Sequence, residues 1–92
     1  DFFDIPRYPG SRRALFIKRL TGSPHSTTIS YETSDDINSV ISFYKNNMNK
    51  WENTKSDMHN NILYFDSMKS WCIVNINGSN KKTTIIIIKY EK

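Results

Sequence analysis

Thr83-Thr84-Ile85-Ile86-Ile87-Ile88-Lys89-Tyr90 is the stretch that decides the fold of this 92-residue chain. β-Branched and aromatic residues dominate it, which is typical of a β-strand. Side chains alternate across a strand, so Ile85 and Ile87 face one side of a sheet while Ile86 and Ile88 face the other. The stretch therefore predicts a strand that is apolar on both faces.

Four further strands are expected before this one. Gly- and Pro-containing or otherwise polar turn segments separate them, and Asn77-Gly78 is a strong signal for the hairpin that leads into the last strand. Residues 52–61 are polar and lack apolar periodicity, so we expect a loop there. The expected strands cover residues 13–20, 26–32, 61–66, 70–77 and 83–90.

One helix is expected between the second and third strands. Thr33-Ser34-Asp35-Asp36 is typical of a helix start, because side-chain oxygens accept hydrogen bonds from the free N–H groups and carboxylates complement the positive helix end. Apolar residues then recur at helical spacing up to Met48, and we expect Trp51 to close the helix end over the sheet. These apolar residues are Ile37, Val40, Ile41, Phe43, Tyr44 and Met48.

The predicted order is ββαβββ, an α+β fold. We expect two layers, with an antiparallel sheet of about five strands and one helix across one face. At this length the chain forms one domain with one core, spanning residues 1–92. Residues 1–11 are expected to form a lead-in that contains Pro6 and Pro9-Gly10 and is too apolar to be left free in water.

The second face of the sheet needs a cover that one helix cannot give. Burying one isoleucine stabilises a protein by about 1.5–3 kcal/mol, so the exposure of Ile86 and Ile88 is costly. Three explanations are open: the strand is central and the lead-in folds over these residues, a protein partner or second copy docks on them, or they are tolerated in water. If a partner docks, the expected interface residues are Phe2, Phe3, Trp71, Ile86 and Ile88.

No pattern in the sequence predicts a catalytic, metal or cofactor site. His25 and His59 lack neighbours at metal-ligand spacing, and none of the three glycines belongs to a phosphate-binding loop. Asp35 and Asp36 are explained by the helix start. Cys72 is the only cysteine and lies in an apolar run, so we expect a buried thiol. We therefore expect a protein that is not an enzyme and binds no cofactor.

The chain carries a formal charge of +4, with basic clusters near both ends. Such clusters can form a solvated face or attract nucleic acid, anionic lipid or acidic protein. Aromatic residues on predicted strands, among them Tyr31, Tyr64, Trp71 and Tyr90, suggest a sheet that stacks nucleic-acid bases. The excess charge is small and no RNP-like signature is present, so this is the alternative to a protein partner.

The location of the protein is a further expectation. The chain begins at Asp1 and not at methionine, so either a targeting segment has been removed or the ordered part of the protein begins here. We expect the first, with a protein that is secreted, periplasmic or envelope-associated. No apolar run approaches the ~20 residues that a membrane-spanning helix needs. Asn77-Gly78-Ser79 matches the N-glycosylation pattern, and we interpret it as a turn.

Ile5-Pro6-Arg7-Tyr8-Pro9-Gly10-Ser11, Phe43-Tyr44 and Trp51 together form a recognisable series. The series resembles small modules of bacterial and archaeal secreted proteins and lipoproteins that carry Tyr-Pro-Gly, Phe-Tyr and Trp in this order. The resemblance runs from Ile5 to Tyr90, although Lys50 stands where those modules commonly have glycine. It implies the fold and an extracytoplasmic setting. We expect an accessory protein-interaction domain, a small subunit of a larger assembly.

Overall fold

The computed structural model describes residues 2, 4–17, 26–48, 51–57, 60–79 and 81–92, with the backbone alone for 15–17 and 53–57. These residues form six strands and one helix. In chain order they are β1 (Arg12–Ile17), β2 (Ser26–Thr33), α1 (Ile37–Asn47), β3 (Glu52–Asp57), β4 (Ile62–Asp66), β5 (Ser70–Ser79) and β6 (Lys82–Glu91).

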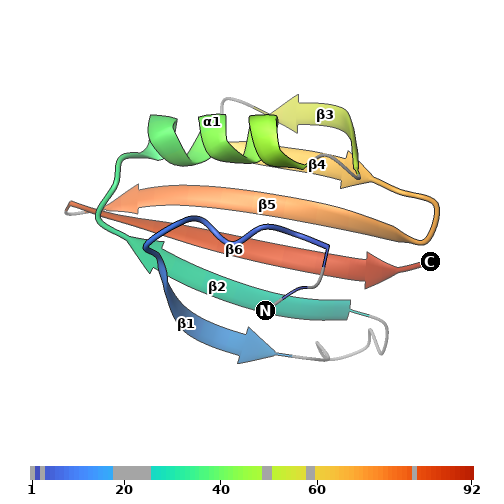
Figure 1. Ribbon diagram of the computed structural model, residues 1–92, viewed down its shortest axis with the longest axis horizontal. Helices are drawn as coiled ribbons and strands as arrows, with labels where there is room; N and C mark the ends of the chain where they lie inside the picture. Colours follow the sequence, from blue (N-terminus) through green and yellow to red (C-terminus); the bar gives the residue numbers. More distant parts are fainter. Residues whose placement is uncertain (1, 3, 18–25, 49–50, 58–59, 80) are drawn as a thin grey trace.

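The strands form one antiparallel sheet in the order β1-β2-β6-β5-β4-β3 (Figure 1). The predicted α+β fold with one helix packed on the sheet is confirmed. β6, which contains the four isoleucines, lies between β2 and β5. A central position fits the apolar character of both faces, because side chains of the neighbouring strands β2 and β5 lie beside the isoleucines on each face.

Residues 52–57 correct the prediction of a loop. They form β3, which pairs with β4 from Glu52↔Asp66 to Asp57↔Ile62. The strand has no apolar alternation because it is the outermost one, where polar and charged residues are favoured at a solvated sheet edge. Periodicity therefore could not reveal it.

The turn between β5 and β6 also differs from the prediction. Pairing continues through Gly78↔Thr83 to Ser79↔Lys82, so the chain reverses beyond Asn77-Gly78. Lys81 adopts the positive φ of 65° that the tight turn needs. Gly78 has another role: a Cβ atom there would lie 2.6 Å from Cδ1 of Ile37, so glycine allows α1 to approach β5.

α1 begins as predicted. Asp36 is the residue before its first turn, and its carboxylate Oδ1 accepts a hydrogen bond of 2.7 Å from the backbone N–H of Ser39. This bond lowers the pKa of Asp36. Val40, Ile41 and Tyr44 are buried against the sheet, which confirms the predicted apolar stripe.

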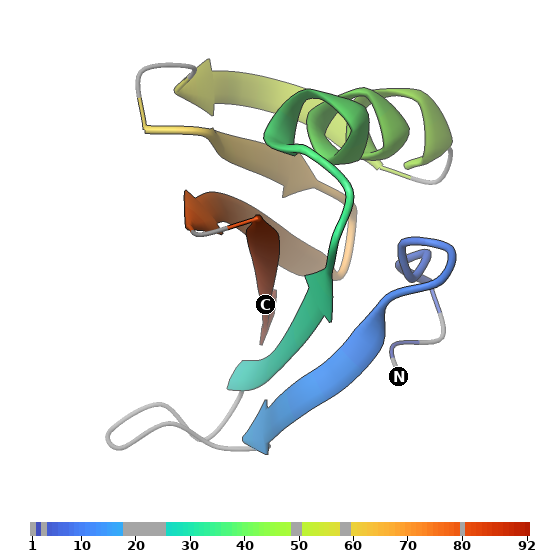
Figure 2. The same ribbon diagram turned by 90° about the vertical axis from the view of Figure 1, so that its left-hand side faces the viewer.

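The lead-in packs on the same face of the sheet as α1, beside β6 and β2 (Figure 1). Ile5 and Tyr8 belong to the buried core, and the indole Nε1–H of Trp51 donates a 3.0 Å hydrogen bond to the carbonyl of Asp4. Lys89 Nζ, on β6, lies 3.0 Å from the Asp4 carboxylate. Viewed from the side, the sheet curves around this layer (Figure 2). The possibility that the lead-in covers the second face is therefore wrong for its described residues.

Candidate functional site

The sheet face opposite α1, called the second face, carries a strip of apolar and aromatic side chains. Burial alternates along β5 and β6, with the more accessible residues on this face. Across the two strands Trp71 pairs with Tyr90 and Ile73 with Ile88, while β4 places Tyr64 opposite Ile73. The strip consists of Tyr64, Trp71, Ile73, Ile86, Ile88 and Tyr90.

The strip is most exposed at the end where β4 turns into β5. Trp71 is 55% exposed and Met68, in the turn, is 95% exposed; among the described residues these are the two exposed large hydrophobic side chains. A partner gains most by covering such side chains, and tryptophan and methionine are enriched in protein interfaces. This end is therefore the centre of the candidate site.

A hollow of 460 Å³ lies beside Trp71 on the second face. Tyr64, Asp66, Trp71 and Ile73 contribute to its walls, together with Phe65 and Cys72. The last two residues are buried, with side chains in the core cluster, so they contribute mainly backbone to the hollow. The Trp71 hollow, as we call it, thus combines aromatic and aliphatic walls with one carboxylate.

Charged residues near the two ends of β6 form ion pairs. At one end Glu32 contacts both Lys82 (2.7 Å) and Arg12 (2.8 Å), and the hydrogen bonds from Lys82 and Arg12 lower the pKa of Glu32. At the other end Lys92 Nζ lies 2.6 Å from Asp66 Oδ1. The side chains of the strip itself are uncharged, which suits a protein interface.

The edges of the sheet are less suited to contact than its second face. Both edge strands have a register shift, in β1 between Arg13 and Leu15 and in β3 between Asn53 and Lys55. Irregular pairing and charged residues at an edge oppose the addition of another strand. With the core face covered by α1 and the lead-in, the part of the second face formed by β4, β5 and β6 is the broad surface that remains; on β2, Thr28 and Ser30 of this face are buried.

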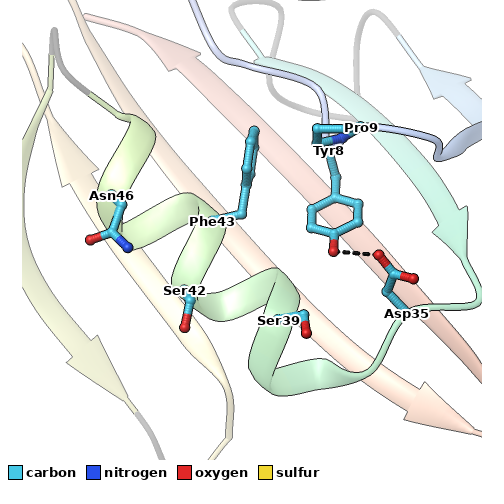
Figure 3. Close-up of a pocket in the computed structure, with 7 residues that line it drawn as sticks. All are labelled: Tyr8, Pro9, Asp35, Ser39, Ser42, Phe43 and Asn46. Atoms are coloured by element: carbon cyan, nitrogen blue, oxygen red, sulfur yellow. Dashed lines mark hydrogen bonds between the residues drawn. The ribbon is translucent and has the colours of Figure 1, made fainter.

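A second hollow, of 310 Å³, lies between the lead-in and α1 (Figure 3). Its main polar contact is the hydrogen bond of 2.5 Å that the Tyr8 hydroxyl donates to Asp35 Oδ2. This bond raises the pKa of Tyr8 to about 12. The Tyr8 ring also packs edge-on against Phe43, with centroids 5.2 Å apart. The contacts attach the lead-in to the helix, which is a structural role.

Reactive groups of the described residues do not converge on either hollow. Cys72 is 1% exposed, as predicted, and burial raises the pKa of its thiol to about 12. No group of three or more His, Cys, Asp or Glu residues in the described part of the chain could hold a metal ion. His25 and His59 lie outside the described residues.

The five predicted interface residues are not all on one surface. Trp71, Ile86 and Ile88 lie together on the second face. Phe2 packs against the core cluster on the other side, and Phe3 lies outside the described residues.

The sequence did not single out Asp66, Met68 and Lys92 for this site, and it named Tyr64 only among the aromatic residues of the nucleic-acid alternative. Alternation along the predicted strand 61–66 places Tyr64 and Asp66 on one face, which was the available signal. The meeting of Asp66 with Lys92 depends on strand order and had no signal in the sequence.

No protein-family model, curated protein or solved structure matches the chain. No helix in the described residues is both long and apolar enough to cross a membrane. The candidate site therefore has to be interpreted from its own geometry and chemistry.

Proposed function

We propose that the chain is a non-enzymatic protein-interaction domain that binds a protein partner through the second face, as a small extracytoplasmic subunit of a larger assembly. The observation that carries the proposal is Trp71, which is more than half exposed within an otherwise half-buried apolar strip. Tryptophan is the residue type most enriched among side chains that dominate binding energy. The extracytoplasmic setting rests on the sequence resemblance.

A protein partner fits the charges of the strip better than a nucleic acid does. Binding to nucleic acid depends on cations that contact phosphates. Here the cations at the two ends of β6, Lys82 and Lys92, already pair with Glu32 and Asp66. These two ion pairs offset part of the positive charge around the aromatic side chains.

Chemical crosslinking in extracts of the native host tests the proposal. Lys69 and Lys92 flank the Trp71 end, whereas Lys45 lies on the exposed side of α1. We expect crosslinks to one protein from Lys69 and Lys92, and their loss in Trp71→Ala, while Lys45→Ala leaves them unchanged. Crosslinks that persist in Trp71→Ala contradict the proposal.

Size-exclusion chromatography with light scattering separates the remaining outcomes. If the purified chain forms a dimer that Trp71→Ala dissociates, the partner is a second copy. A monomer that yields no second-face crosslinks in extracts contradicts the proposed function. Binding to single-stranded nucleic acid that weakens steeply with salt would favour the nucleic-acid alternative.

A further inference from the structure

The Trp71 hollow has the chemistry of a site for an organic cation. Its walls include the aromatic rings of Tyr64 and Trp71 and the carboxylate of Asp66. The faces of aromatic rings attract cations, and a carboxylate accepts two parallel hydrogen bonds from a guanidinium. We propose that the partner inserts an arginine side chain into this hollow. The inference rests on the proposed function and names the group that the partner contributes.

Strand register brings the three groups together. Asp66 lies directly opposite Trp71 across β4 and β5, and Tyr64 lies opposite Ile73. Tyr64 is therefore the diagonal neighbour of Trp71, at roughly 7–8 Å, which long aromatic side chains can bridge. A planar guanidinium can stack on a ring while its edge meets the carboxylate, a combination that the compact ammonium of lysine cannot match.

Lys92 shows that this position attracts a cation. Its Nζ lies 2.6 Å from Asp66 Oδ1 and donates a 2.7 Å hydrogen bond to the carbonyl of Ser67. Asp66 Oδ1 is itself buried and, despite this close ion pair, has no hydrogen-bond partner among the described residues. Both side chains are more than one-third exposed, and such ion pairs contribute little to stability. An arginine can therefore displace Lys92.

Nuclear magnetic resonance of the indole N–H groups provides a direct test, because the chain has two tryptophans in different environments. Trp71 borders the hollow, while Trp51 is buried and its indole N–H is hydrogen-bonded to the carbonyl of Asp4. The probe is N-acetyl-arginine-N-methylamide, and the neutral comparison is N-acetyl-norleucine-N-methylamide. We expect the arginine probe to shift the Trp71 signal saturably and to leave the Trp51 signal in place. An equal response to both probes, or none to arginine, overturns the inference.

Matched variants separate the carboxylate of the hollow from charge in general. Asp66→Asn should weaken binding of the arginine probe about tenfold, the equivalent of one charge-assisted hydrogen bond. Glu32→Gln removes a carboxylate from the opposite end of the sheet and should have no effect. Lys92→Gln should strengthen binding severalfold because the competing cation is gone, whereas Lys82→Gln should not. Equal effects within either matched pair contradict the inference.

The two proposals can fail separately. If Trp71→Ala abolishes the crosslinks to the partner but the arginine probe does not bind, the proposed interaction surface is supported and the proposed arginine contact is wrong. If the probe binds as expected but no second-face crosslinks form, the hollow binds a cation and the proposed function is wrong.

Discussion

The two faces of β6 carry the same residue type in different surroundings. Ile85 and Ile87 are 0% and 1% exposed beneath α1 and the lead-in, whereas Ile86 and Ile88 remain half-buried on the second face. Ser30 and Thr28 flank the latter pair on β2, and small hydroxyl residues cannot cover them. Residue type thus indicates that a strand is central. The layer above each face decides which isoleucines are buried in the core and which remain available to a partner.

The largest difference between the faces should appear on truncation of the isoleucines. Ile87→Ala leaves a cavity in the core and should lower the free energy of unfolding by about 3 kcal/mol. Ile86→Ala removes the same atoms from a half-buried position and should cost about 1 kcal/mol. Urea denaturation measures both values. Equal losses would show that the second face is as well covered as the core.

Residues 77 and 78, which lie on opposite faces at the end of β5, allow the two faces of the sheet to be compared a second time. Gly78→Ala introduces a Cβ atom 2.6 Å from Ile37 Cδ1, so the Ile37 side chain has to move, and the protein should be destabilised by about 1 kcal/mol. Asn77→Ala, on the second face, should change stability by less than about 0.5 kcal/mol. Thermal denaturation compares the two. Ile37→Val should recover part of the Gly78→Ala loss, and no recovery would exclude the clash as its cause.

The attachment of the lead-in to the core face can be tested through Tyr8. Tyr8→Phe removes the hydrogen bond to Asp35 and should cost about 1 kcal/mol. The hydrogen bond raises the pKa of Tyr8 to about 12, so the folded state keeps a proton that the unfolded state releases near pH 10. This contribution is therefore complete below about pH 10 and lost as the pH rises toward 12. Stability curves of the two proteins should converge over that range.

The last prediction compares the chemical reactivity of a thiol on each face of the sheet, with the smallest expected effect on stability. Burial raises the pKa of Cys72 to about 12, so the native protein should not react with a thiol reagent at pH 8 until it unfolds. A cysteine introduced by Ile73→Cys in a Cys72→Ser background lies on the second face and should react without unfolding. Colorimetric thiol titration measures both rates. A protected cysteine at 73 would mean that this face is covered.

The sequence predicted the helix and its start well because capping and apolar spacing are local. It missed β3, whose polar residues form a strand only because β4 supplies the hydrogen bonds. The turn was predicted too early because the glycine at position 78 makes room for the Ile37 side chain, a contact between distant segments, and does not form the turn. The same limit holds for the candidate site: Trp71, Ile86 and Ile88 follow from alternation, but their association with Asp66 and Lys92 requires the strand order.

The central place of β6 also constrains the order in which the molecule can assemble. Thr28 on β2 pairs with Ile88, so residues sixty positions apart must meet before that half of the sheet exists. On a ribosome the β1–β2 hairpin would wait for β6 to emerge before it could join β5. Such long-range closure slows folding. Nascent chains that stop short of β6 should therefore hold their first hairpin in a form that proteases readily cleave.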